Sequence, residues 1–115
     1  MVNIYDSANQ VASDLTQVDQ FVAVKAAIAK VKADDASYKL YHRLNAVQIK
    51  ITSAREQGKT VSSEDSKAYE AIAAAVKQDK NILALLDAEG SMYQFVNELQ
   101  GIMLKPMRDI YKVLG

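Results

Sequence analysis

The chain contains very few of the residues that interrupt helices. Its 115 residues include four glycines and one proline. Sandwiches and barrels of β-strands need many tight turns, which glycine and proline usually form, so an all-β fold is strongly disfavoured. Apolar residues instead recur at spacings of three and four, the period of an amphipathic helix. The sequence therefore predicts an all-α protein.

Short polar breaks divide the chain into about five expected helices, packed as an antiparallel bundle in a single domain, residues 1–115. Asn3 is expected to cap the first helix, and Asp19 the second. Ser62, followed three residues later by an acidic residue, resembles a capping box at the start of the fourth helix. Gly58 is expected to end the third, because glycine adopts positive φ without a steric clash. The breaks are expected at 16–19, 34–37, 58–61 and 79–81.

The fifth helix is expected to be long and to begin near Asn81. It continues to about Lys105, where Pro106 follows. Proline has no N–H for the helical hydrogen-bond ladder, so the sequence predicts a kink or a new short helix there. The last residues, which keep an apolar face, are expected to form a short C-terminal helical segment.

The fifth helix carries a heptad-like apolar seam. At 1.5 Å per residue, residues 81–105 would measure about 37 Å, whereas a compact chain of this length has a diameter of about 34 Å. A helix that spans or overhangs the molecule with an apolar seam needs a partner surface, and a second copy is the simplest partner. We therefore expect a homo-oligomer, most simply a dimer. The seam residues are Ile82, Leu85, Glu89, Met92, Val96, Leu99 and Met103.

Little in the sequence indicates catalysis, and neither an enzyme nor a bound cofactor is expected. The chain has no cysteine and a single histidine, His42, which cannot build the common zinc sites. Glu89 is the one charged residue in the seam. Its stem is expected to pack while its carboxylate reaches water or a lysine. A hydrogen bond to Gln48 is the alternative, and a catalytic role ranks last.

Charge and hydropathy restrict the partners and the compartment. Fourteen basic residues balance fourteen acidic ones, so a dedicated nucleic-acid-binding protein is not expected. No apolar stretch is long enough to cross a membrane, and the N-terminus does not resemble a signal peptide, so we expect a cytoplasmic protein. The alternative function is an RNA-binding accessory factor that uses basic helical faces. These faces carry Lys39, Arg43 and Lys50, and Lys105, Arg108 and Lys112.

Several short features, in the same order along nearly the whole chain, resemble the YlbF/YmcA-like family of small bacterial proteins, especially its YheA-like branch. Each feature is weak alone, but together with the chain length they are fairly specific. They are the run Asn3-Ile4-Tyr5-Asp6, Gln48, Gly58, Asn81, the pair Ala88-Glu89, the pair Lys105-Pro106 and Tyr111.

The resemblance implies an all-helical domain that associates with itself. Members of the YlbF and YmcA type are regulatory proteins that join a cytoplasmic complex affecting competence, sporulation, biofilm formation and RNA processing through a ribonuclease. The resemblance therefore implies a regulatory or adaptor role through contacts with other cytoplasmic proteins, and no catalytic residue. Some relatives are associated with an iron–sulfur cluster held by cysteines, and this chain, without cysteine, cannot supply such ligands.

Overall fold

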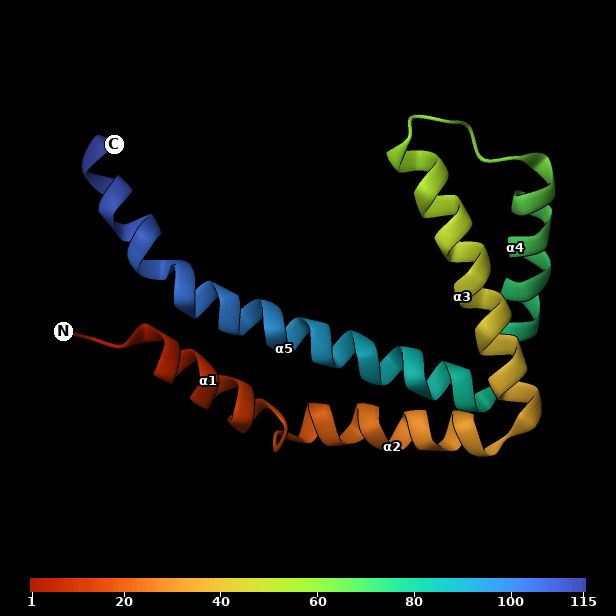
Figure 1. The fold of residues 1–115 in the computed structure, drawn as a ribbon, viewed down its shortest axis with the longest axis horizontal. Helices are drawn as coiled ribbons and strands as arrows, with labels where there is room; N and C mark the ends of the chain where they lie inside the picture. Colours follow the sequence, from red (N-terminus) through yellow and green to blue (C-terminus); the bar gives the residue numbers. More distant parts are fainter. The chain divides into compact units, whose positions relative to one another are not determined.

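The fold is all-α, as predicted. A computed structural model describes residues 1–115, which form five α-helices and no β-strand (Figure 1). The helices are α1 (Ile4–Leu15), α2 (Asp19–Ala33), α3 (Asp35–Glu56), α4 (Ser63–Val76) and α5 (Lys80–Tyr111), followed by the 3-10 turn η1 (Lys112–Leu114).

The chain divides into two units. The middle unit is Lys25–Leu86, and the end unit combines Met1–Val24 with Asp87–Gly115. Helices α2 and α5 each contribute to both units. The two units differ sharply in burial, because every buried residue of the chain lies in the middle unit. The middle unit therefore has its own core, whereas the end unit has none.

The core of the middle unit is built from one face of each of its helices. Helices α3 and α4 pack against each other, and the buried residues lie at helical spacing on α3, at the end of α4, in the first turns of α5 and on α2. Ile82 and Leu85 on α5 are its most deeply buried members, at 0% and 2% exposure. The remaining buried apolar residues are Ala27, Val31, Leu40, Leu44, Val47 and Val76.

Helices α3 and α4 form an antiparallel hairpin with a cap on either side of the loop (Figure 1). Gly58 has φ +70°, and its N–H donates to the carbonyl of Arg55 while the N–H of Lys59 donates to the carbonyl of Ala54. These two bonds form a Schellman motif at the end of α3. Ser62 Oγ accepts the N–H of Asp65 at 3.0 Å and caps α4. Both caps were predicted from the sequence.

Replacing Gly58 with alanine is expected to lower the free energy of unfolding by about 1 kcal/mol, because a residue with a Cβ is strained at positive φ. No atom lies within 4 Å of the added Cβ, so the cost is conformational only. Gly90→Ala is the matched control. Gly90 is helical and equally unobstructed, so this change should raise stability by about 0.5–1 kcal/mol. Urea unfolding followed by circular dichroism measures the free energy of unfolding of both variants. Equal shifts in the same direction would contradict the role of Gly58 as the residue with positive φ that ends α3.

A polar network joins the starts of α3 and α5 within the middle unit. The buried Ser37 hydroxyl donates to the Asp79 carboxylate at 2.8 Å, and Asp79 Oδ1 also accepts the N–H of Ile82 at 3.0 Å. Asp79 therefore acts as the N-cap of α5, two residues before the expected start at Asn81. The Asn81 amide in turn donates to Ser37 Oγ at 3.2 Å. The N-cap of α3 is Asp34, which accepts the N–H of Ser37.

At the start of the chain, one predicted cap is confirmed and one is wrong. Asn3 Oδ1 accepts the N–H groups of Tyr5 and Asp6 and caps α1. Asp19, expected to cap α2, is instead its first helical residue, because the N–H of Val22 donates to the carbonyl of Val18. An acidic group in the first turn still stabilises the helix through its dipole.

Of the two outcomes predicted at Pro106, a kink or a new short helix, the new helix is not found. Helix α5 continues through Pro106 to Tyr111, and it changes direction near this end (Figure 1). Proline cannot donate to the carbonyl of Ile102, four residues earlier. The Arg108 guanidinium donates to the carbonyl of Gly101 at 2.8 Å, in the same part of the helix. The short C-terminal segment is the 3-10 turn η1.

Candidate protein-interaction surfaces

The predicted seam of α5 runs from a buried end to an exposed end. Ile82 and Leu85 fill the core of the middle unit, so the part of the seam that a partner could contact begins further along the helix. Within the end unit, the next four positions are half-buried. Met103 is 66% exposed. The half-buried positions are Glu89, Met92, Val96 and Leu99.

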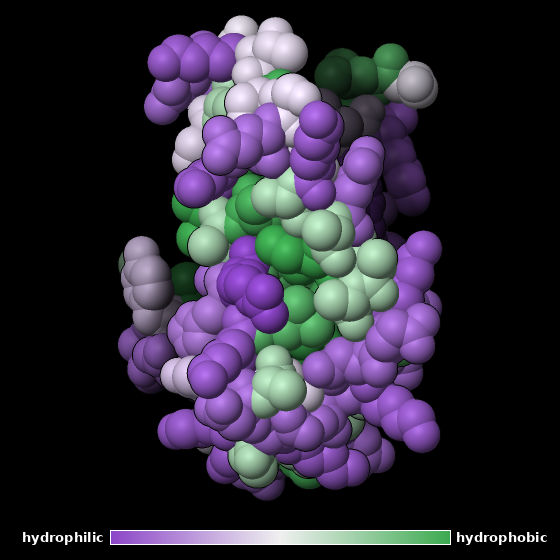
Figure 2. Space-filling view, turned by 90° about the vertical axis from the view of Figure 1, so that its right-hand side faces the viewer, coloured by the Kyte–Doolittle hydropathy of each residue, from purple (hydrophilic) through white to green (hydrophobic).

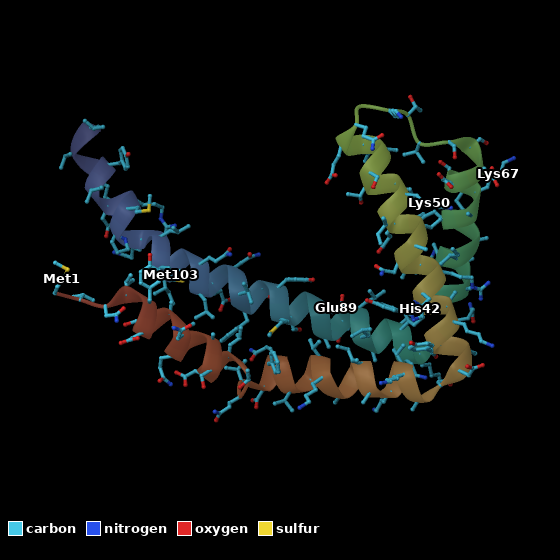
Figure 3. The ribbon with its side chains drawn as sticks, in the orientation of Figure 1. Met1, His42, Lys50, Lys67, Glu89 and Met103 are labelled. Atoms are coloured by element: carbon cyan, nitrogen blue, oxygen red, sulfur yellow. The ribbon has the colours of Figure 1, made fainter.

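In the end unit, the exposed fraction of apolar side chains rises along α1 toward the N-terminus and along α5 toward the C-terminus. On α1, Leu15 is half-buried, whereas Val11 is 44% and Ile4 65% exposed. Met103 projects on the side of α5 that faces α1, and α1 does not cover it (Figure 3). A soluble protein seldom leaves a run of large apolar side chains exposed unless they contact another surface.

Beyond Leu99, five large apolar residues gather on one side of α5, and we call them the C-terminal apolar face. They are Met103, Leu104, Met107, Ile110 and Tyr111, all exposed. At 100° per residue they cover about a third of the helix circumference. The sequence pattern identified only the first of them as an interface residue, because the expected break at Pro106 hid the continuity of this face.

The opposite side of the same helical segment is charged. The Asp109 carboxylate accepts a hydrogen bond from the Lys105 ammonium at 2.8 Å and forms an ion pair with the Lys112 ammonium at 3.1 Å. The Lys105 ammonium, and then that of Lys112, hold the pKa of the Asp109 carboxyl below its usual range. These pairs therefore stabilise the folded protein at a pH above the ordinary carboxyl pKa. This stabilisation is lost as the pH falls through the lowered pKa of Asp109. Because the groups are exposed, it is small.

The basic residues of the alternative RNA-binding hypothesis are mostly engaged within the chain. Lys39 pairs with Asp35 at 3.0 Å, and Arg108 donates to a backbone carbonyl. Lys105 and Lys112 share Asp109. Arg43 and Lys50 form no ion pair, and Lys50 lies on α3 in the middle unit (Figure 3).

A groove of about 540 Å³ opens between α3 and α4, on the side of the loop that joins them. Ile51 and Val61 are half-buried there, in contrast to the buried residues at the other end of the hairpin. Figure 2 shows a face of the molecule on which apolar side chains form a strip bordered by hydrophilic ones. Sequence reasoning missed this groove. Its lining residues are Gln48, Ile51, Thr52, Arg55, Val61, Ser66, Tyr69 and Glu70.

The residues considered for catalysis are not brought together. His42 is exposed on α3, where its ring meets the edge of Tyr38 with centroids 4.6 Å apart. Glu89 is half-buried and forms no hydrogen bond or ion pair with another residue. Gln48 lines the α3–α4 groove. No group of three or more His, Asp or Glu side chains is placed to hold a metal ion, and no helix is long and apolar enough to cross a membrane.

Comparison with known proteins gives a match along almost the whole chain. The profile of a family described as "Control of competence regulator ComK, YlbF/YmcA" matches residues 4–108. A UPF0342 protein of Lactobacillus helveticus is 45% identical over 114 residues, covering 99% of this chain and 98% of the relative. A UPF0342 protein of Staphylococcus aureus is 37% identical over 110 residues, covering 96% of each.

Two solved structures share the fold. A protein of unknown function (DUF964) from Bacillus stearothermophilus superposes with a TM-score of 0.84 at 18% identity, over 94% of this chain and 95% of the other. The yheA protein from Bacillus subtilis superposes with a TM-score of 0.72 at 24% identity, over 96% and 100%. At these identities the likeness concerns the fold alone.

Proposed function

The chain belongs to the YlbF/YmcA family, which is linked to competence regulation. On that premise we propose that it is a non-catalytic regulatory or adaptor protein that acts through self-association and contacts with other proteins. The observation that supports this proposal most is the burial pattern. No residue of the end unit is buried, although that unit contains all of α1 and most of α5. Amphipathic helices gain most of their stability from packing their apolar face, so these helices need a further surface.

The proposal is tested by measuring the mass of the purified protein in solution. Light scattering at micromolar concentration should give at least twice the 12.7 kDa of one chain. Association driven by apolar burial should also persist at high salt, because salt screens charges and leaves apolar burial intact. A strictly monomeric protein across the micromolar range would remove self-association from the proposal.

A further inference from the structure

One uncovered side of α5 in the end unit carries six residues that we call the α5 stripe. They follow one another at spacings of four and three residues, so at 100° per residue they cover about 100° of the helix circumference. Five of them are exposed, and Glu89 is half-buried. Tyr93 is 66% exposed and Leu104 is 47% exposed. The members of the stripe are Glu89, Tyr93, Asn97, Gln100, Leu104 and Arg108.

The α5 stripe is complementary to its own reverse. When a second α5 lies antiparallel to the first, with the point between residues 98 and 99 shared, each member of the stripe faces another member. A carboxylate then faces a guanidinium, a tyrosine ring faces an aliphatic side chain, and one side-chain amide faces another. The facing pairs are Glu89 with Arg108, Tyr93 with Leu104, and Asn97 with Gln100.

We propose that two copies of this chain associate through an antiparallel contact of their α5 stripes, about a two-fold axis near Leu99. This inference rests on the proposed self-association and specifies its surface and its orientation. A two-fold contact uses the same surface on both copies, so each complementary pair forms twice. Met103 and Met107 lie beside the stripe, toward the side of α5 that faces α1, so a helix docked on the stripe also reaches them.

The two charges of the α5 stripe have no ion-pair partner in their own chain. Glu89 forms no hydrogen bond or ion pair, and Arg108 forms only its bond to the backbone carbonyl of Gly101. The two residues are 19 positions apart on one helix, which is about 28 Å along its axis, so they cannot meet within one chain.

These charges also select the orientation of the second copy. In a parallel pair, Glu89 would face Glu89 and Arg108 would face Arg108, and both contacts would be repulsive. In the antiparallel pair both contacts are attractive. Complementary charges of this kind fix the register and suppress the wrong arrangement.

Reversing the charges tests the inference. Glu89→Arg and Arg108→Glu each turn two attractive contacts of the pair into repulsive ones, so the dissociation constant measured by light scattering should rise at least about tenfold. The double variant with both changes should regain the affinity of the original protein. Glu98→Arg is the matched control, because Glu98 is exposed on the other side of α5, and it should leave the dissociation constant within about twofold. Circular dichroism verifies that all the variants keep their helical content.

Engineered cysteines test the orientation independently, because the chain has no cysteine of its own. Tyr93→Cys and Leu104→Cys occupy facing positions in the antiparallel pair. A mixture of the two variants should therefore form a disulfide-linked dimer on oxidation much faster than either variant alone. In the antiparallel pair, two copies of the same variant hold their cysteines about 16 Å apart along the helix axes, which is too far for a disulfide. A parallel pair would give the reverse result, with fast oxidation of each variant alone.

The outcomes separate this inference from the proposed function. If the original protein assembles and the charge reversals leave its dissociation constant unchanged, self-association stands and the α5 stripe is not its site. Failure of the double variant to recover, or fast oxidation of either cysteine variant alone, would likewise overturn the antiparallel contact. If the original protein is monomeric, the proposed self-association and this inference fail together.

Discussion

Met103→Glu is expected to weaken the assembly of this protein at least about a hundredfold, because an ionised carboxylate would have to be buried against apolar side chains of a partner. Met103 is 66% exposed within one chain, so the substitution leaves the core of the middle unit intact. Light scattering over a dilution series should show the mass of one chain at concentrations where the original protein is assembled. The helical signal per residue should change little at the highest concentrations.

Gln94→Glu is the control for this substitution. Gln94 is also exposed on α5 in the end unit and gains the same charge, but helical geometry places it on the opposite side from the C-terminal apolar face. Its variant should assemble like the original protein. If both variants dissociated, net charge would be the cause. If neither did, the apolar side of α5 that includes Met103 would not be an interface.

Ile82→Ala is expected to destabilise the protein by about 2–5 kcal/mol, since it removes a fully buried side chain and leaves a cavity. Ile82 is 0% exposed and belongs to the first turn of α5, where Asp79 accepts its N–H. Urea unfolding at a fixed protein concentration measures the loss. The mass of the assembled protein should not change below the unfolding transition, because Ile82 is covered by its own chain.

Leu83→Ala provides the comparison, because it removes a side chain of similar size from the next position, which is 42% exposed. Its cost should be below about 1 kcal/mol. Dissociation by Ile82→Ala with unchanged stability would show that this residue contacts a partner, as the heptad pattern alone had suggested, and would contradict the core described for the middle unit.

The parts of the fold that the sequence predicted are those set by local signals. Asn3, Gly58 and Ser62 act on N–H and carbonyl groups within a few residues, so their identity is enough to place a helix end. Asp79 caps α5 through an equally local bond from the N–H of Ile82, and this cap was missed because the start of α5 was expected at Asn81. Only the contact of Asp79 with Ser37, 42 residues away, has no local signal in the sequence. At Pro106 the sequence left a kink and a new short helix open, because proline removes one hydrogen bond of the ladder without fixing whether the helix continues beyond it.

The interaction surfaces were only partly predictable. A heptad pattern identifies the apolar side of α5 but does not say what covers each part of it. Ile82 and Leu85 are covered by the chain itself and Met103 is not, a difference that depends on where the other helices end. The α3–α4 groove depends on how two helices separate toward their loop, which helical periodicity does not encode.

Hydrogen exchange of backbone amides during dilution tests most directly the claim that the end unit is completed by another protein chain. In the assembled protein, amides of α5 beyond Asp87 should exchange slowly, and their protection should fall as dilution dissociates the assembly. Amides of the middle unit, including those near Leu40 and Leu85, should keep their protection because they surround an internal core. Protection of α5 that is high and independent of protein concentration would contradict the account.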